Sequence, residues 1–358
     1  MDIVLLNSNL EAIYILDSYE TFIWTDRYCE CGDFELHSRA YPGLVDLSYG
    51  DSDYFLQIRE SEHIMVLEKF VIKSDVEEGD TITLSGRSLE SILDRRIVWG
   101  QRIISGKLQD GVKQLLELCI INPEDPARKI DNFIFKESED PAITELTIEA
   151  QYTGDNLYDV IVAICKGNDL GFRLTFTDER QFVFELYSGL DRSYSQETNS
   201  YVVFSPKFDN LMNSDYIKSR STLKNVTLVG GEGEGAERKY STVGSATGLN
   251  RRELFTDARD ISSQTDDAFL SEADYDSQLQ QRGTEKLAEA IAVESFEGEV
   301  DNTGLYRYGE DFYTGDIVQM INEYGHGTPA RILEMVISES GDGKSTYPTL
   351  SAITPKGE

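Results

Sequence analysis

Two stretches of this chain, one near its start and one at its end, resemble each other closely. They cover residues 66–86 and 332–352. One constant offset, with no gap, places Leu67 on Leu333 and keeps the order of matching residues throughout. Each stretch predicts an apolar-rich strand, a Gly/Asp turn and a second strand, which is a β-hairpin. Any two β-hairpins share a few letters, but here order and spacing agree over about twenty residues, the size of one supersecondary unit. We therefore expect two versions of one β-domain.

The length of 358 residues is enough for two or three domains. The predicted fold class is mainly β with α+β insertions, with two related β-barrel domains, a small α+β middle domain and one long helix. The first β-barrel domain is expected at 1–105 and the α+β middle domain at 106–198. The second β-barrel domain is expected at 199–262 and 294–358, with a helical excursion at 263–293.

Helical patterns mark the middle domain and the excursion. Val112, Leu115 and Cys119 are spaced for one buried helical face, and a second amphipathic pattern covers 154–165. Residues 271–293 predict the long helix, which opens with the capping signal Ser-Glu-Ala-Asp. This helix can pack on its own barrel or between subunits, and we expect the first. Ser88 is the expected N-cap of a short helix that closes the first barrel.

The strongest feature of the composition is its charge. Sixty-five acidic residues against 33 basic ones give a net charge of −32. Such a surface disfavours binding to nucleic acid through its phosphates, and an anionic membrane repels it. The excess of acid either maintains solubility or forms a surface that nucleic acid passes without sticking. The sequence also predicts neither a signal peptide nor a transmembrane helix.

Cysteine usage predicts a reducing environment during folding. Cys29 and Cys31 are expected on one strand, facing the same side, where a disulfide would be strained. Cys119 and Cys165 fall in apolar helical patterns, as small core residues do. We therefore expect four free thiols, as in a protein that folds in the cytoplasm.

No catalytic, cofactor-binding or metal-binding residue is predicted. The three histidines lie in unrelated segments: His37, His63 and His326. His326 is expected at a hairpin tip in a turn role. The pairs Asp51/Asp53 and Asp274/Asp276 lack the spacing of a calcium loop and are expected to be solvated. Residues 230–235 are rich in glycine but lack the Lys and Ser/Thr of a phosphate-binding loop, so a surface loop is expected. We expect the protein not to be an enzyme and to need no cofactor.

Several motifs are similar to those of a known family. They lie at 85–96, Ser-Gly-Arg-Ser-Leu-Glu-Ser-Ile-Leu-Asp-Arg-Arg, and at 281–288, 294–300, 306–318 and 330–334. In this order they resemble the tail-hub proteins of long-tailed phages of Gram-positive hosts, also called tail-associated or Tal-like proteins. These motifs belong to the scaffold, and the resemblance carries over no catalytic residue.

The resemblance implies a fold like the hub of contractile tails, with two related β-barrels per chain in a homotrimer. It implies a pseudo-sixfold ring that joins a hexameric distal tail protein to trimeric tip components. The tape measure protein and the tip or receptor-binding proteins would be further partners. DNA would pass through the lumen without sequence-specific contact. Assembly would occur in the bacterial host's cytoplasm, and the mature location would be the tail tip or baseplate of the virion.

Two other functions compete with this hub. One is a tail protein that binds or degrades host cell-wall glycans, and the other is an acidic multidomain β-protein with no role in a tail. The lack of a recognisable catalytic constellation disfavours a wall-degrading enzyme, and a glycan binder needs an exposed aromatic groove. The repeat and the motif set favour the hub over the third alternative.

Overall fold

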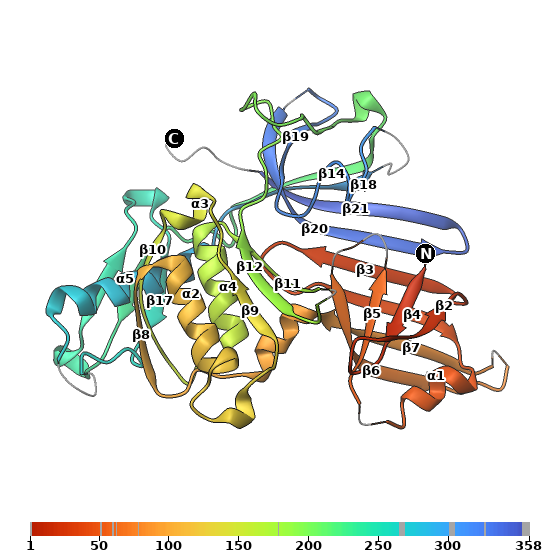
Figure 1. The fold of residues 1–358 in the computed structure, drawn as a ribbon. Coiled ribbons are helices and arrows are strands. Elements are labelled where there is room, and N and C mark those ends of the chain that lie inside the picture. The colour runs from red at the N-terminus through yellow and green to blue at the C-terminus, as the bar shows by residue number, and fades with distance from the viewer. Residues whose placement is uncertain are drawn as a thin grey trace.

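The computed structural model describes residues 2–50, 52–58, 61, 63–77, 79–177, 179–264, 269–300, 305–325 and 327–352. Strands make up 42% and helices 22% of it, so the predicted fold class, mainly β with α+β insertions, is confirmed. The elements fall into two β-units, a middle unit and a small unit (Figure 1).

The first β-unit contains β1 (Ile3–Leu6), β2 (Ala12–Leu16), β3 (Thr21–Arg27), β4 (Asp33–Arg39), α1 (Pro42–Leu47), β5 (Tyr54–Ile58), β6 (Ile64–Lys73) and β7 (Thr81–Ser88). The second β-unit contains β13 (Val203–Phe204), the short helix η4 (Pro206–Phe208), β14 (Leu211–Ser219), β18 (Val293–Val300), β19 (Ile317–Ile321), β20 (Gly327–Ser340) and β21 (Gly343–Ala352).

The two β-units share one 13-stranded sheet, although they lie at opposite ends of the chain. β3 of the first unit pairs antiparallel with β20 of the second, and Figure 1 shows these strands side by side. The sheet runs β14-β18-β21-β20-β3-β4-β7-β6-β5-β1-β2, and β19 and β13 branch from β20. The related β-units are therefore joined edge to edge by backbone hydrogen bonds.

Both units use the same strand order. In the first it is β3-β4-β7-β6-β5-β1, and in the second it is β14-β18-β21-β20-β19-β13. Corresponding strands also follow one another in the same sequence along the chain. One difference is that β1 runs antiparallel to β5, whereas β13 runs parallel to β19. The repeat seen in the two hairpins therefore extends over six strands of each unit.

A β-bulge marks the same place in both hairpins and corrects the sequence alignment. The ladder of β6 with β7 shifts between Leu67 and Lys69, and that of β20 with β21 shifts between Ile332 and Glu334. Structurally, Leu67 therefore corresponds to Ile332 and not to Leu333. The ungapped alignment is therefore one residue out of register along β6 and β20 and two residues out along β7 and β21, where Gly86 corresponds to Leu350. A slip of one residue reverses the face to which a strand side chain points.

The middle unit follows the first β-unit. It contains η1 (Leu89–Arg95), β8 (Gln101–Lys107), α2 (Leu108–Leu116), the π-helical turn η2 (Glu117–Ile121), η3 (Pro126–Arg128), β9 (Phe133–Lys136), α3 (Pro141–Thr144), β10 (Thr147–Thr153), α4 (Leu157–Asn168), β11 (Gly171–Phe176) and β12 (Phe182–Tyr187). α2 and α4 agree with the predicted helical faces, and Val112, Leu115 and Cys119 are buried. Ser88 precedes the 3-10 helix η1, but its side chain accepts from Gly32 N instead of capping that helix.

The small unit lies between β14 and β18 in the chain. It contains β15 (Val226–Gly230), η5 (Gly235–Glu237), β16 (Tyr240–Val243), η6 (Gly248–Asn250), β17 (Glu253–Asp257) and α5 (Glu272–Ala288). β15–β17 form a separate three-stranded sheet, whereas we expected residues 199–262 to supply the second barrel. This insertion occupies the place of the short β3–β4 connection in the first unit.

The long helix begins as predicted, because Ser271 Oγ accepts a hydrogen bond from Asp274 N. It packs within its own chain, but against α4, β10 and the small sheet and not on a barrel. Gly283 permits the contact, since a Cβ there would lie 2.7 Å from Val243 Cγ2.

The cysteines differ from expectation in one respect. All four are free, as expected, but Cys29 and Cys31 lie in the bend between β3 and β4 and not on a strand. Tyr158 OH contacts Cys31 Sγ at 3.2 Å, so the middle unit covers this bend.

Candidate functional site

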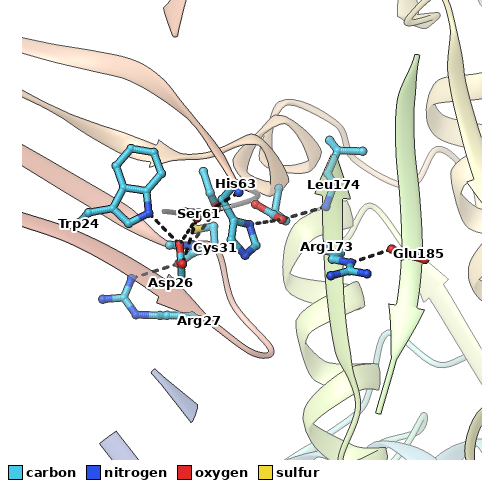
Figure 2. Close-up of polar contacts among 12 residues, drawn as sticks. Trp24, Asp26, Arg27, Cys31, Ser61, His63, Arg173, Leu174 and Glu185 are labelled. Carbon is cyan, nitrogen blue, oxygen red and sulfur yellow. Dashed lines mark hydrogen bonds and ion pairs between the residues drawn. The ribbon is translucent and has the colours of Figure 1, made fainter. Parts of the chain in front are cut away.

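Buried polar side chains gather where the first β-unit meets the middle unit and the second β-unit (Figure 2). Asp26, near the end of β3, is 1% exposed. Its carboxylate accepts hydrogen bonds from Trp24 Nε1 at 2.8 Å and from Ser61 Oγ at 3.0 Å. Tyr308 OH, from the segment before β19, donates to it at 2.7 Å. Three donors from separate segments thus satisfy one buried carboxyl group.

A second buried carboxylate lies close by, paired with a histidine. Glu90 of η1 is 1% exposed, and its Oε1 lies 3.3 Å from His63 Nδ1. Leu174 N of β11 donates to the same oxygen at 2.8 Å. The pair therefore connects the start of β6 to the middle unit. Figure 2 shows His63 between Asp26 and the strand that carries Leu174.

The charges of this cluster reinforce one another. Burial disfavours the imidazolium of His63, but the carboxylates of Asp26 and Glu90 outweigh it and raise the pKa of His63 to about 9. Burial also disfavours the Glu90 carboxylate, but His63 and the hydrogen bonds outweigh this effect and lower the pKa of Glu90. At neutral pH the pair is therefore ionised. A histidine held in its protonated form is a poor general base.

A third buried carboxylate joins the second β-unit to the segment after the middle unit. Asp316, 3% exposed, accepts from Leu190 N at 2.7 Å and from Arg192 Nε at 2.8 Å. The backbone of the next residue adds to this contact, since Ile317 N donates to Leu190 O at 2.9 Å and Ile317 O accepts from Arg192 N at 2.7 Å.

A buried arginine crosses the same boundary from β20. Arg331, 6% exposed, donates to Ser188 O and to Asp169 Oδ2, both at 2.7 Å. Its guanidinium carbon lies 5.0 Å from the centre of the Tyr28 ring. A planar guanidinium can serve a carbonyl, a carboxylate and an aromatic face together. Arg331 therefore joins the first, second and middle units at one point.

A cleft of about 700 Å³ opens beside these groups. Its lining carries both signs of charge. The basic side chains include His63 and Arg173, and the acidic ones include Glu185 and Asp316. Arg173 Nε donates to Glu185 Oε1 at 2.6 Å, so this pair is already satisfied by the fold. The described lining contains no cysteine, and its lysine, Lys136, pairs with Glu185 Oε2 at 2.8 Å.

The structure does not bring together the residues that the sequence analysis considered as site candidates. Asp53 pairs with Arg95 at 2.9 Å, and Asp274 and Asp276 bond to Ser271 and Gln280 in their own helix. His37 contacts Glu35 on the exposed face of β4. Asp51 and His326 lie outside the described residues. The role of His63 could not be predicted, because its partners are remote in the chain and no local motif signals them.

Within the described residues, no group of three or more His, Cys, Asp and Glu side chains is placed to hold a metal ion. Among the described helices, none is both long and apolar enough to span a membrane. The contacts of the buried cluster connect the units, since Leu174 N donates to Glu90, Tyr308 OH to Asp26 and Arg331 to Asp169.

Known structures share this fold at low sequence identity. The 43 kDa tail protein of prophage MuSo2 from Shewanella oneidensis is 14% identical, with a TM-score of 0.58 and 98% of each chain covered. Prophage tail protein gp18 from Listeria monocytogenes EGD-e is also 14% identical, with a TM-score of 0.55, covering 99% of this chain and 96% of that one. A chain of the Francisella PdpA-VgrG complex is 10% identical, with a TM-score of 0.51, covering 100% of this chain and 53% of that one.

The sequence comparisons add the family. The chain matches no curated protein. Over residues 2–350 it matches the family described as Siphovirus ReqiPepy6 Gp37-like protein. Because this match covers nearly the whole chain, the protein belongs to the siphovirus Gp37-like family, and it has the fold of phage tail proteins.

Proposed function

We propose that this protein is the structural hub of a siphovirus tail tip. Three copies form a ring, and the ring joins the hexameric end of the tail tube to trimeric tip components. The observation that carries the proposal is the duplication: each chain holds two β-units with the same order of six strands. A homotrimer of such chains presents six similar surfaces, which is what contact with a sixfold partner requires.

The joint between the units supports this role. A hub needs its two β-units held in a fixed relative orientation, because a regular ring requires the same orientation in every chain. Backbone pairing of β3 with β20 and the buried charges around Asp26, His63 and Arg331 supply that rigidity. A charge of −32 agrees with a lumen that DNA crosses without binding, because like charges repel.

The partners follow from the position in the particle. They are the distal tail hexamer on one side, the tape measure protein within the channel, and the tip or receptor-binding proteins on the other side. The ring forms or closes the DNA channel. Its role is structural and not enzymatic, and its location is the tail tip of the virion after assembly in the host cytoplasm.

One observation favours a second function, the binding of host-wall glycans. The cleft of about 700 Å³ has three tyrosines in its lining: Tyr187, Tyr308 and Tyr313. Aromatic rings in a cleft suit sugar rings. Tyr187 and Tyr308 are, however, largely committed to other side chains of the joint.

Light scattering on the pure protein, alone and with the distal tail ring of the same particle, tests the proposal. The expected mass is three times the chain mass of 40.4 kDa, alone or on the ring. A monomer that ignores the ring contradicts the hub. If that monomer binds peptidoglycan fragments, the glycan function replaces it.

A further inference from the structure

The strand pairing that joins the two β-units within one chain also indicates how two chains can pair. β3 lies against the second half of β20, with Trp24 opposite Ile337. Both side chains are buried, at 0% and 1% exposure, in the core of the first β-unit. The contact thus combines ladder hydrogen bonds with an apolar pair directly across the strands.

The repeat assigns a counterpart to each residue of this junction. In each unit, a row of directly paired residues starts just before the bulge and crosses four strands. In the first unit the row is Leu67, Gly86, Phe34 and Trp24. In the second unit it is Ile332, Leu350, Phe296 and Tyr216. β14 therefore corresponds to β3, and Tyr216 to Trp24. Counting on from the bulges, Ile72 of β6 corresponds to Ile337 of β20.

Both counterpart edges lack a strand neighbour in the described part of this chain. β14 is the last strand of the sheet and pairs with β18 alone. β6 pairs with β5 only as far as Leu67, so its second half has β7 on one side and no strand on the other. The corresponding strand β20 likewise pairs with β19 only as far as Arg331. From Glu334 onward, however, β3 of the same chain pairs with this edge of β20.

The side chains on these two edges are exposed where their counterparts are buried. Tyr216 is 41% exposed, compared with 0% for Trp24. Ile72 is 42% exposed, compared with 1% for Ile337. Exposed apolar residues on a strand edge form a template for pairing with another chain. Tyr216 OH donates to Glu294 Oε1 at 2.8 Å.

We propose that β14 of one copy pairs antiparallel with the second half of β6 of the next copy, in the register that β3 and β20 use within the chain. Tyr216 then lies opposite Ile72 of the next copy. Asp215 lies opposite Lys73 of the next copy, so an acid faces a base across the strands. This charge complementarity and the apolar pair identify the occupant of both edges as a second copy of this chain.

The number of copies rests on the proposed function. β14 and β6 are different surfaces, so the contact is head-to-tail and closes into a ring when the rotation permits. In a trimer, three junctions lie within chains and three between chains, and all six use corresponding strands. The ring therefore has nearly sixfold symmetry although it contains only three chains.

Cysteine cross-linking tests the register. The variant Tyr216→Cys/Ile72→Cys places two thiols directly opposite each other, where the Cα atoms of antiparallel strands lie about 4.5–5.5 Å apart. That spacing suits a disulfide. Mild oxidation is expected to give covalent dimers and trimers on non-reducing gels. Both positions are partly exposed, so folding should survive the substitutions.

Three controls sharpen the result. Tyr216→Cys/Val71→Cys is shifted by one residue, which points the two thiols to opposite faces, and it should cross-link far less. Each single variant alone should stay unlinked, whereas a mixture of the two should give dimers and nothing larger. The wild type controls for the four native thiols, three of which are buried.

Charge exchange gives a second readout that needs no oxidation. Asp215→Lys and Lys73→Asp should each weaken assembly measured by light scattering, and the double variant should restore it.

The outcomes separate the pairing from the hub itself. A trimer by mass in which Tyr216→Cys/Ile72→Cys stays unlinked overturns the strand pairing and leaves the hub standing. Cross-linking of Tyr216→Cys to Tyr14→Cys on β2, the other end of the sheet, would overturn it in favour of that edge. A chain that remains monomeric at all concentrations and on the ring contradicts both proposals.

Discussion

At the scale of single residues, the bulges decide which positions are core. Ile332 is fully buried in the second β-unit, whereas Leu333, one residue later, is half-buried at the bulge. The ungapped alignment predicts that Leu333→Asp abolishes folding. In the structure Ile332 is the core residue, so we expect Ile332→Asp to abolish folding instead. An unpaired charge in that core should cost about 3–5 kcal/mol or more. Leu67→Asp should be equally severe, because Leu67 is 6% exposed.

Soluble yield and thermal unfolding measure the difference. Ile332→Asp should fail to accumulate as folded protein, while Leu333→Asp should remain soluble with a lower melting temperature. Equal behaviour of the two variants would show that the bulge does not separate core from surface here.

The buried His63–Glu90 pair predicts a dependence of stability on pH. The pKa of His63 is raised to about 9, above its unfolded value of about 6.5. The charged form therefore contributes stability that is complete below about pH 6.5 and is lost as pH rises through about 9. His63→Gln should cost about 3–5 kcal/mol at pH 6, because it leaves a buried carboxylate without its partner.

Urea unfolding of both proteins at pH 6, 7.5 and 9.5 measures this effect. The gap between wild type and His63→Gln should narrow steadily as pH rises. His37→Gln, at the exposed histidine of β4, is the matched control and should cost far less stability at pH 6 than His63→Gln. A gap that stays constant would mean that His63 is not charged in the folded protein.

At the scale of elements, the bulge in β6 depends on a glycine in β7. A Cβ on Gly86 would lie 1.8 Å from Val66 O, a backbone atom that cannot move aside without breaking the ladder. Gly86→Ala should therefore destabilise the protein by about 1–3 kcal/mol or more. Gly341, in the turn after β20, has no atom within 4 Å of such a Cβ. Gly341→Ala should stay within about 0.5 kcal/mol of wild type by chemical denaturation. Equal losses in the two variants would contradict this account of the bulge.

Elements with a strong local pattern could be predicted from the sequence. α2, α4 and the capped start of α5 follow directly from apolar spacing and from Ser271. The hairpin of β6 and β7 and that of β20 and β21 were also predicted, but not their bulges, because a bulge depends on pairing across strands. The separate sheet of β15–β17 could not be predicted, since the affiliation of a strand is set by remote partners and not by its own residues.

At the scale of the whole molecule, duplication was visible in the sequence, but the junction was not. The pairing of β3 with β20 joins residues about 300 positions apart in the chain, with Arg27 opposite Glu334. The buried cluster around His63 arises from the same long-range assembly. For this reason the sequence indicated a pair of related β-units and a family resemblance, whereas the candidate site and the open edges required the structure.

The central claim is that two β-units per chain present six similar surfaces in a trimer. End-on class averages of the assembled particle in negative-stain electron microscopy test it most directly. The account predicts a closed ring with strong sixfold as well as threefold rotational power, six lobes around one channel. A ring with threefold power alone, or particles without a closed ring, would contradict it.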